Sequence, residues 1–214
     1  MRDTLLFDLD GTLVDTAPDL VRVTNAVIAE DGRPPIPLDE LRSYVGLGAR
    51  HLLRRAYKAE VGDDRVEEMF HTFLALYADG VAELSQPFPG VLDTLANLQR
   101  AGHQLHVCTN KPGDLARQLL DALDMSAFFG RVVGADDLPR NKPHSDHVFA
   151  SAGHRERDRI VLVGDSGTDT LAARNARVPS ILVTYGYSPE PLETLKATRI
   201  IRSFREVEAV VAEL

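Results

Sequence analysis

Two aspartates stand two positions apart where an apolar stretch near the start of the chain ends. The stretch LLFDLDGT, residues 5–12, carries Asp8 and Asp10, and a second acidic pair, Asp165 and Asp169, follows the apolar stretch IVLVG at 160–164. In one crevice, each close pair of carboxylates would repel by roughly 4 kcal/mol at intermediate dielectric. A hard divalent cation relieves that repulsion, and Mg²⁺ favours a few carboxylates together with substrate oxygens. The acids therefore predict a magnesium site.

Neutral hydrogen-bond donors follow one further apolar stretch, and a lysine lies in the loop after another. Thr109 and Asn110 follow LHVC at 105–108, and Lys142 lies in the loop after RVVGA at 131–135. Lysine supplies a fixed positive charge, and the hydroxyl and amide groups supply hydrogen bonds. Together with a metal ion, these groups would form a cradle for a phosphate dianion.

The apolar stretches that carry these residues are typical of buried strands. They are short, rich in Val and Ile and bounded by turn residues, and they predict strands at 4–9, 105–110, 131–135, 160–165 and 180–185. Amphipathic helical patterns lie between them, at 91–102 and 114–123. We predict an α/β fold: a Rossmann-like parallel sheet with helices on both faces, which gathers the polar residues at one sheet edge.

Residues 16–82 interrupt the alternation and have helical patterns throughout. One apolar stripe runs from Leu20 to Ile28, and further patterns cover about 38–58 and 64–82. The turn-forming stretch QPFPG at 86–90 leads back to the α/β part. We predict an α/β catalytic core of residues 1–15 and 83–214, with a small all-helical cap of residues 16–82 inserted after the first strand.

Composition limits the partners. The chain has 214 residues, a net charge of −8 and one cysteine. An acidic surface repels nucleic acid and anionic membranes, and no apolar run approaches the length of a membrane span. The lone Cys108 cannot form an internal disulfide, and we interpret it as a core residue of a cytoplasmic protein. The expected state is a monomer or a small homo-oligomer.

Four motifs, in order, resemble those of the haloacid dehalogenase-like hydrolase superfamily, and the resemblance covers nearly the whole chain. They are DLDGTLVDT (8–16), CTN (108–110), the lysine of KPHSD (142–146) and GDSGTD (164–169). TNKP (109–112), VGADDLPRNKPHSD (133–146) and YVGLGA (44–49) are similar to its phosphoglycolate phosphatase-like subgroup. The chain departs from that subgroup at Ser145, where proline is usual, and at Arg177, where glycine is usual. Both departures concern loop shape more than chemistry.

The resemblance implies roles for the first motif. Asp8 matches the nucleophile that takes the phosphoryl group as an aspartyl-phosphate. Asp10 matches the general acid/base, and its backbone carbonyl is expected to touch the metal. Gly11 would allow close backbone approach to the substrate. Asp8, Asp10 and Asp165 are the expected Mg²⁺ ligands.

The resemblance implies roles for the remaining motifs as well. Thr109 and Lys142 match the groups that hold the phosphate oxygens, and Asn110 lies beside them. Asp169 matches an outer acidic position that acts through water or Lys142. Purely structural roles are the alternative to these catalytic and binding roles. Thr109 could cap the next helix, Asp165 could be an N-cap, and Asp169 could interact with the dipole of the helix in its first turn.

Residues in the cap and the histidines give weaker indications. Gly46 and Gly48 in YVGLGAR could break a helix or form a loop over the substrate, and Arg50 could reach a substrate carboxylate. His144 and His147 lie at helical spacing near Lys142. No carboxylate or cysteine completes a ligand set around them, so we interpret them as surface or loop residues.

The predicted activity is Mg²⁺-dependent phosphomonoester hydrolysis of a small phosphorylated metabolite, with 2-phosphoglycolate as the leading substrate. Asp10 argues against a dehalogenase of the same superfamily, which would not be expected to carry an acid there. The insert has only Lys58, late in its sequence, which argues against a phosphonate hydrolase. A sugar-phosphate mutase and a non-catalytic phosphometabolite-binding module stay as alternatives.

Overall fold

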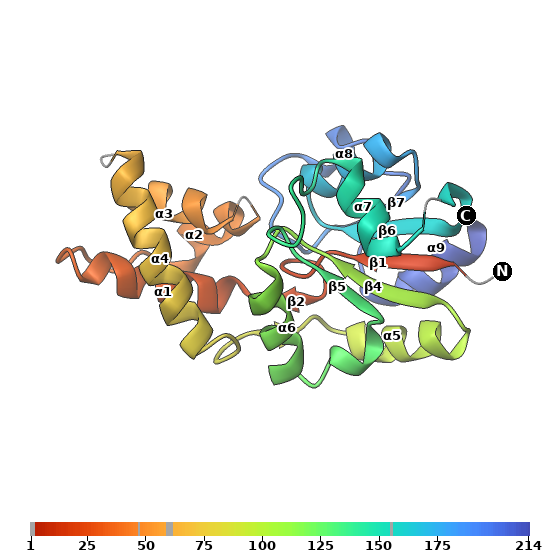
Figure 1. The fold of residues 1–214 in the computed structure, drawn as a ribbon, viewed down its shortest axis with the longest axis horizontal. Helices are drawn as coiled ribbons and strands as arrows, with labels where there is room; N and C mark the ends of the chain where they lie inside the picture. Colours follow the sequence, from red (N-terminus) through yellow and green to blue (C-terminus); the bar gives the residue numbers. More distant parts are fainter. Residues whose placement is uncertain (1–2, 47, 59–61, 155) are drawn as a thin grey trace.

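The core of the molecule is a six-stranded sheet in which every strand pairs in parallel with its neighbours (Figure 1). The computed structural model describes residues 3–46, 48–58, 62–154 and 156–214. The order across the sheet is β5-β4-β1-β6-β7-β8. In that order the strands are β5 (Arg131–Val133), β4 (Gln104–Cys108), β1 (Thr4–Phe7), β6 (Ile160–Gly164), β7 (Ser180–Val183) and β8 (Arg199–Ile201).

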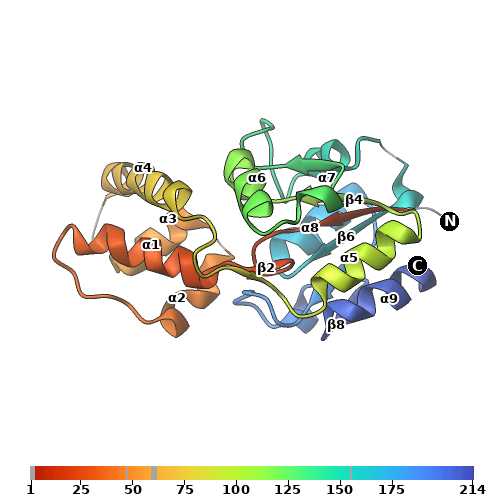
Figure 2. The ribbon, with the colours of Figure 1, turned by 90° about the horizontal axis from the view of Figure 1, so that it is seen from below.

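Helices cover both faces of the sheet, because alternate side chains of each strand must be buried on opposite sides. Leu6 packs with α7 (Ser145–Ala152) and α8 (Gly167–Ala176) on one face. Leu5 and Phe7 pack on the other face in the main apolar cluster, on the side of α5 (Val91–Arg100) and α9 (Val207–Glu213) (Figures 1 and 2). The predicted α/β class and doubly covered parallel sheet are confirmed. Helix α6 (Gly113–Ala122) packs beside β5.

Four helices lie together at one end of the molecule, beyond the strands (Figures 1 and 2). They pack on one another through an apolar cluster that includes Val23, Leu53 and Phe73. They are α1 (Ala17–Ala29), α2 (Leu38–Val45), α3 (Ala49–Ala56) and α4 (Asp63–Asp79).

The chain runs to and from this helical group through one short antiparallel ladder. It pairs β2 (Val14–Asp15) with β3 (Gln86–Pro87), in the register Val14 to Pro87 and Asp15 to Gln86. Beside it, the buried Asp19 carboxylate accepts hydrogen bonds from the backbone N–H groups of Leu84 and Ser85, at 2.9 and 2.8 Å. The first and last turns of the helical group are thereby held together.

Gly46 and Gly48 separate two helices, which is one of the two roles considered for them. Gly46 ends α2 and Gly48, at φ 91°, precedes α3; Leu47 of YVGLGA lies outside the described residues. The strand β8 and the β2–β3 ladder were not predicted.

Among the described helices, none combines the length and the apolar character that crossing a bilayer requires.

Candidate active site

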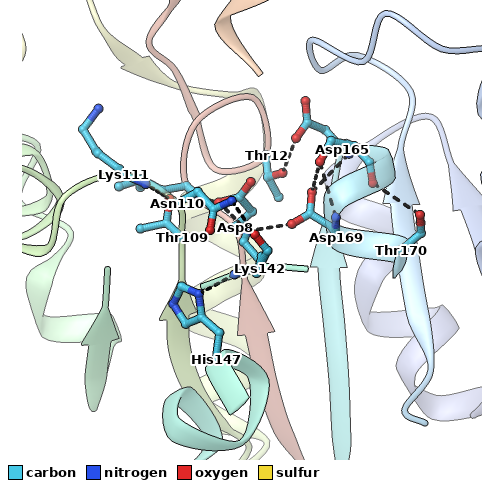
Figure 3. Close-up of polar contacts among 12 residues, drawn as sticks. Asp8, Thr12, Thr109, Asn110, Lys111, Lys142, His147, Asp165, Asp169 and Thr170 are labelled. Atoms are coloured by element: carbon cyan, nitrogen blue, oxygen red, sulfur yellow. Dashed lines mark hydrogen bonds and ion pairs between the residues drawn. The ribbon is translucent and has the colours of Figure 1, made fainter. Parts of the chain in front are cut away.

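Strand order brings the predicted acids together at the carboxyl edge of the sheet (Figure 3). Asp8 follows β1, Asp165 follows the neighbouring β6, and Asp169 lies in the first turn of α8. One carboxylate oxygen from each of these three residues lies within 4.8 Å of the others, and the side chains of Asp8 and Asp169 are 13% and 1% exposed. Hard carboxylate oxygens at one buried point suit Mg²⁺. Both oxygens of Asp169 already accept hydrogen bonds, from Lys142 and Ser166. Asp8 and Asp165 are therefore the carboxylates available to a metal ion.

Burial destabilises the ionised forms of these carboxylates when no cation lies beside them. It raises the pKa of Asp8 to about 6, against the opposing effect of Lys142. Burial, together with the charges of Asp169 and Asp8, raises the pKa of Asp165 well above its ordinary value. A divalent ion held by these oxygens would favour the ionised forms, so the residues present fit a metal site.

Lys142 is the cation that the chain itself supplies. Its Nζ lies 3.0 Å from Asp8 Oδ1 and 2.6 Å from Asp169 Oδ1, and its side chain is 1% exposed. Burial would lower the pKa of Lys142, but the carboxylates of Asp169 and Asp8 raise it above its ordinary value. The ammonium therefore stays charged beside the predicted nucleophile.

Two side chains fix the backbone of Lys142. His147 Nδ1 accepts from the Lys142 N–H at 3.0 Å, and His147 Nε2 lies 3.0 Å from the Val133 carbonyl, which requires a proton on Nε2. Asn110 Nδ2 donates to the Lys142 carbonyl at 3.0 Å. Burial and the Lys142 charge lower the pKa of His147 to about 4, so the ring is neutral. The interpretation of His147 as a surface or loop residue was wrong, because it is fully buried in α7.

The two carboxylate oxygens of Asp169 have different partners, one in the helix cap and one in the candidate active site. Its Oδ2 accepts from the N–H and hydroxyl of Ser166, which is the N-cap of α8 in a capping box, while Oδ1 faces Lys142. Ser166, and not Asp165, is the N-cap of this helix. The contact with Lys142 is the one expected of an outer acidic position.

The loop after Asp10 closes against Asp165. Gly11 has φ 83°, and a Cβ at this position would lie 2.5 Å from Asp165 Oδ2, so only glycine fits. The Thr12 hydroxyl donates to Asp165 Oδ1 at 3.4 Å, and the Tyr187 N–H donates to Oδ2 at 2.6 Å. Tyr187, which the sequence patterns did not identify, thus helps to orient the carboxylate of Asp165.

Asp10 is not one of the three clustered acids and forms an ion pair with Lys111. The Lys111 Nζ donates to Asp10 Oδ1 at 3.1 Å and to the hydroxyl of Tyr77, on α4, at 2.9 Å. Burial would lower the pKa of Lys111, but Asp10 raises it above its ordinary value. Figure 3 shows Lys111 extending away from Asp165 and Asp169. Our assignment missed both partners; Lys111 stands in the TNKP motif, but no motif marks Tyr77.

The remaining predicted binding residues lie at different depths. Thr109 is buried between β4 and α6, and its hydroxyl oxygen accepts from the Lys111 N–H at 3.2 Å, which leaves its own hydrogen to donate. Gly46 lies against Tyr187, since a Cβ there would be 3.5 Å from the Tyr187 Cβ. At Gly48, no atom of the described residues beyond its chain neighbours lies within 4 Å of the corresponding point.

Arg50 is held within the helical group. It forms a two-bonded ion pair with Glu67, at 2.6 and 2.9 Å, and its guanidinium lies 3.6 Å from the centre of the Phe70 ring. Its role in binding a substrate carboxylate stays a prediction.

Comparison with known proteins identifies the family of the chain. A family model described as haloacid dehalogenase-like hydrolase matches residues 5–183. The chain belongs to this family. Among its members it is 46% identical over 209 residues to a phosphoglycolate phosphatase of Caulobacter vibrioides, covering 95% of this chain and 88% of the relative. It is 38% identical over 213 residues to one of Agrobacterium fabrum, covering 97% and 91%.

Solved structures of the family share the whole architecture. A crystal structure described as a predicted phosphoglycolate phosphatase from Haemophilus somnus superposes with a TM-score of 0.88 at 29% identity, covering 98% of both chains. Another, described as a phosphoglycolate phosphatase from Lactobacillus delbrueckii subsp. bulgaricus, gives 0.86 at 27% identity, covering 99% of both. The protein is a phosphatase of the haloacid dehalogenase-like hydrolase family.

Proposed function

We propose that the protein is a Mg²⁺-dependent phosphomonoester hydrolase that acts on 2-phosphoglycolate through an aspartyl-phosphate on Asp8. The observation that carries this proposal is the buried arrangement of Asp8 beside Lys142, with Asp165 and Asp169 close by. A carboxylate next to a fixed ammonium and a cation site can approach a phosphate dianion that it would otherwise repel.

The first half-reaction transfers the phosphoryl group to the enzyme. A carboxylate oxygen of Asp8 bonds to phosphorus as the bond from phosphorus to the ester oxygen breaks, and Asp10 gives its proton to the leaving oxygen. Lys142 and the hydroxyl of Thr109 hold charge that develops on the other phosphoryl oxygens. When bound, Mg²⁺ would be held by Asp8, Asp165 and the Asp10 backbone carbonyl, and would neutralise phosphate charge.

The second half-reaction restores the enzyme. Asp10, now ionised, removes a proton from water, the water oxygen bonds to phosphorus, and the acyl phosphate bond to Asp8 breaks. The alcohol formed in the first half-reaction leaves before the water attacks, and inorganic phosphate leaves at the end. We propose that residues 16–82 act as the cap that excludes bulk water during this sequence, over a core of residues 1–15 and 83–214.

The substrate proposal is supported by the relatives. Those of Caulobacter vibrioides and Agrobacterium fabrum are named phosphoglycolate phosphatases, and the matches span almost the whole of each chain. Activity on other phosphomonoesters is the alternative outcome of the test below.

The test is phosphate release from 2-phosphoglycolate by wild-type protein, Asp8→Asn and the exposed control Asp39→Asn, with Mg²⁺ and with EDTA. We expect turnover only with Mg²⁺, loss of turnover in Asp8→Asn, and unchanged rates in Asp39→Asn. Acid quenching during turnover should trap phosphoprotein in wild type but not in Asp8→Asn. Appreciable activity of Asp8→Asn would refute the nucleophile, and conversion of glucose 1-phosphate without phosphate release would favour a mutase.

A further inference from the structure

A buried ammonium group stands where the helical group meets the sheet. Lys111 Nζ lies 3.1 Å from Asp10 Oδ1 and 2.9 Å from the Tyr77 hydroxyl, and the Lys111 side chain is 4% exposed. Tyr77 comes from α4, and Lys111 from the loop before α6. The predicted acid/base is therefore in contact with a cation that is itself held by the helical group.

The Tyr77 hydroxyl has a hydrogen-bond donor to spare. The Lys111 ammonium directs its three N–H donors to both carboxylate oxygens of Asp10, at 3.1 and 3.3 Å, and to the Tyr77 hydroxyl, at 2.9 Å. The Tyr77 hydroxyl oxygen accepts from Lys111, and among the residues that the structure describes, no acceptor takes the hydroxyl hydrogen of Tyr77. Tyr77 is 1% exposed, and a buried donor without an acceptor is unfavourable. The Tyr77 hydroxyl thus lacks an acceptor.

The position of Asp10 determines what that acceptor can be. To protonate the leaving group, Asp10 must come within about 3 Å of the leaving oxygen. Lys111 Nζ, at 3.1 Å from Asp10, then lies within about 6 Å of that oxygen. In 2-phosphoglycolate the carboxylate is separated from the leaving oxygen by one CH₂ group, so its own oxygens lie about 3 Å from the leaving oxygen. A carboxylate there is within reach of the ammonium.

Arg50, the other candidate for this role, is already paired. Its guanidinium bonds both carboxylate oxygens of Glu67 and stacks on Phe70, and its side chain is 47% exposed. Lys111 is paired as well, with Asp10, but its side chain is only 4% exposed. Solvent screens its charge less than the charge of the exposed Arg50, so Lys111 distinguishes a charged substrate group from a neutral one more strongly.

We propose that Lys111 and Tyr77 form the site that binds the substrate's carboxylate, and so select phosphate esters with a carboxylate one carbon from the ester oxygen. This inference rests on the proposed function and extends it to specificity. The carboxylate accepts from the Tyr77 hydroxyl and from the Lys111 N–H that otherwise makes the longer contact, at 3.3 Å, with Asp10 Oδ2. Since these donors come from the core and from the helical group, the same contacts bring the two parts together around the substrate.

The test compares two substrates that differ only in this group: 2-phosphoglycolate and its neutral amide, 2-phosphoglycolamide. Wild type should prefer the acid by about thirtyfold or more in kcat/KM, as expected when a buried charge pair is broken. In Lys111→Met this preference should fall to near one, and in Tyr77→Phe it should fall several-fold. The exposed Lys196→Met is the matched control and should keep the wild-type preference.

Several outcomes would overturn the inference. If Lys111→Met lowered kcat/KM equally for both substrates, Lys111 would only position Asp10. If wild type itself showed no preference for the acid, the inference would fail whatever the folding of the variants. Circular dichroism checks the fold, and Lys111→Gln gives a second neutral variant. Wild type without turnover on either substrate would instead refute the proposed function.

Discussion

Replacing Lys142 by methionine should destabilise the metal-free protein strongly at neutral and alkaline pH. The substitution keeps side-chain length and removes the charge that lies 3.0 Å from Asp8 and 2.6 Å from Asp169. Removing one partner of a buried ion pair costs about 3–5 kcal/mol, because a buried charge is left uncompensated. Both carboxylates lose their cation here, so we expect the upper part of that range at pH 8.

The loss should shrink as the pH falls. With Lys142 present, burial already raises the pKa of Asp8 to about 6, above the value of about 3.9 for an unfolded chain. Without Lys142 this folded-state pKa must rise further. A carboxyl whose folded pKa is raised destabilises the fold above that pKa and ceases to do so once both states are protonated. Lowering the pH from 8 to 5 should therefore recover at least half of the lost free energy of unfolding.

Urea unfolding of wild type, Lys142→Met and the exposed control Lys196→Met, with EDTA, measures these differences. The control should match wild type at both pH values. A loss for Lys142→Met below about 1 kcal/mol at pH 8, or an equal loss at pH 8 and pH 5, would refute the view that Lys142 neutralises two buried acids. Added Mg²⁺ should restore part of the stability of Lys142→Met, since it binds only the folded form of the site.

Three further changes test other parts of the structure. Asp10→Asn should slow both formation and hydrolysis of the phosphoenzyme by about 10²-fold or more, measured by rapid quench; an unchanged rate would assign the proton transfer to another group. Burial would raise the pKa of Asp19, but hydrogen bonds from Ser85, Leu84 and Arg22 hold this pKa below its ordinary value. The ionised Asp19 carboxylate therefore adds to the free energy of unfolding above about pH 4, and this stabilisation is lost at lower pH. Asp19→Asn should thus cost about 1–3 kcal/mol at pH 7 and less at pH 3 in urea unfolding; a loss that does not depend on pH would contradict this. His147 has its pKa lowered to about 4, so acidification from pH 6.5 to 4 should destabilise wild type by up to about 3 kcal/mol, and His147→Gln should show a smaller loss.

The sequence patterns predicted the sheet well because its strands are buried on both faces. Segments such as IVLVG at 160–164 are apolar at every position, and their shortness and β-branched residues favour a covered parallel strand over a buried helix. The edge strand β8 was missed because it has three residues, two of them exposed, and its sequence, RII, lies between polar residues. Gly46 and Gly48 separate two helices within 38–58, and the sequence left open whether they break a helix or form a loop, because glycine is compatible with both.

The acids of the site were predictable for the same reason: each follows a recognisable strand. The residues that orient them were not. Tyr77 reaches the site from a helix whose sequence looks like any amphipathic helix, and its role depends on how α4 lies against the core. Tyr187 acts partly through its backbone N–H, which no residue type reveals. His147 looked solvent-exposed because its burial depends on α7 packing beside β5.

The ladder between β2 and β3 makes the helical group a removable module. Asp15 and Gln86 are register partners, so the two points where the chain departs from the sheet and rejoins it are already adjacent. Insertions with neighbouring ends disturb their host little, because the host chain needs no long bridge when the insert is exchanged. Recombination at this ladder would therefore exchange the helical group and leave Asp8, Lys142 and Asp165 in place. If the helical group is the proposed cap, such an exchange would change substrate selection without changing these residues.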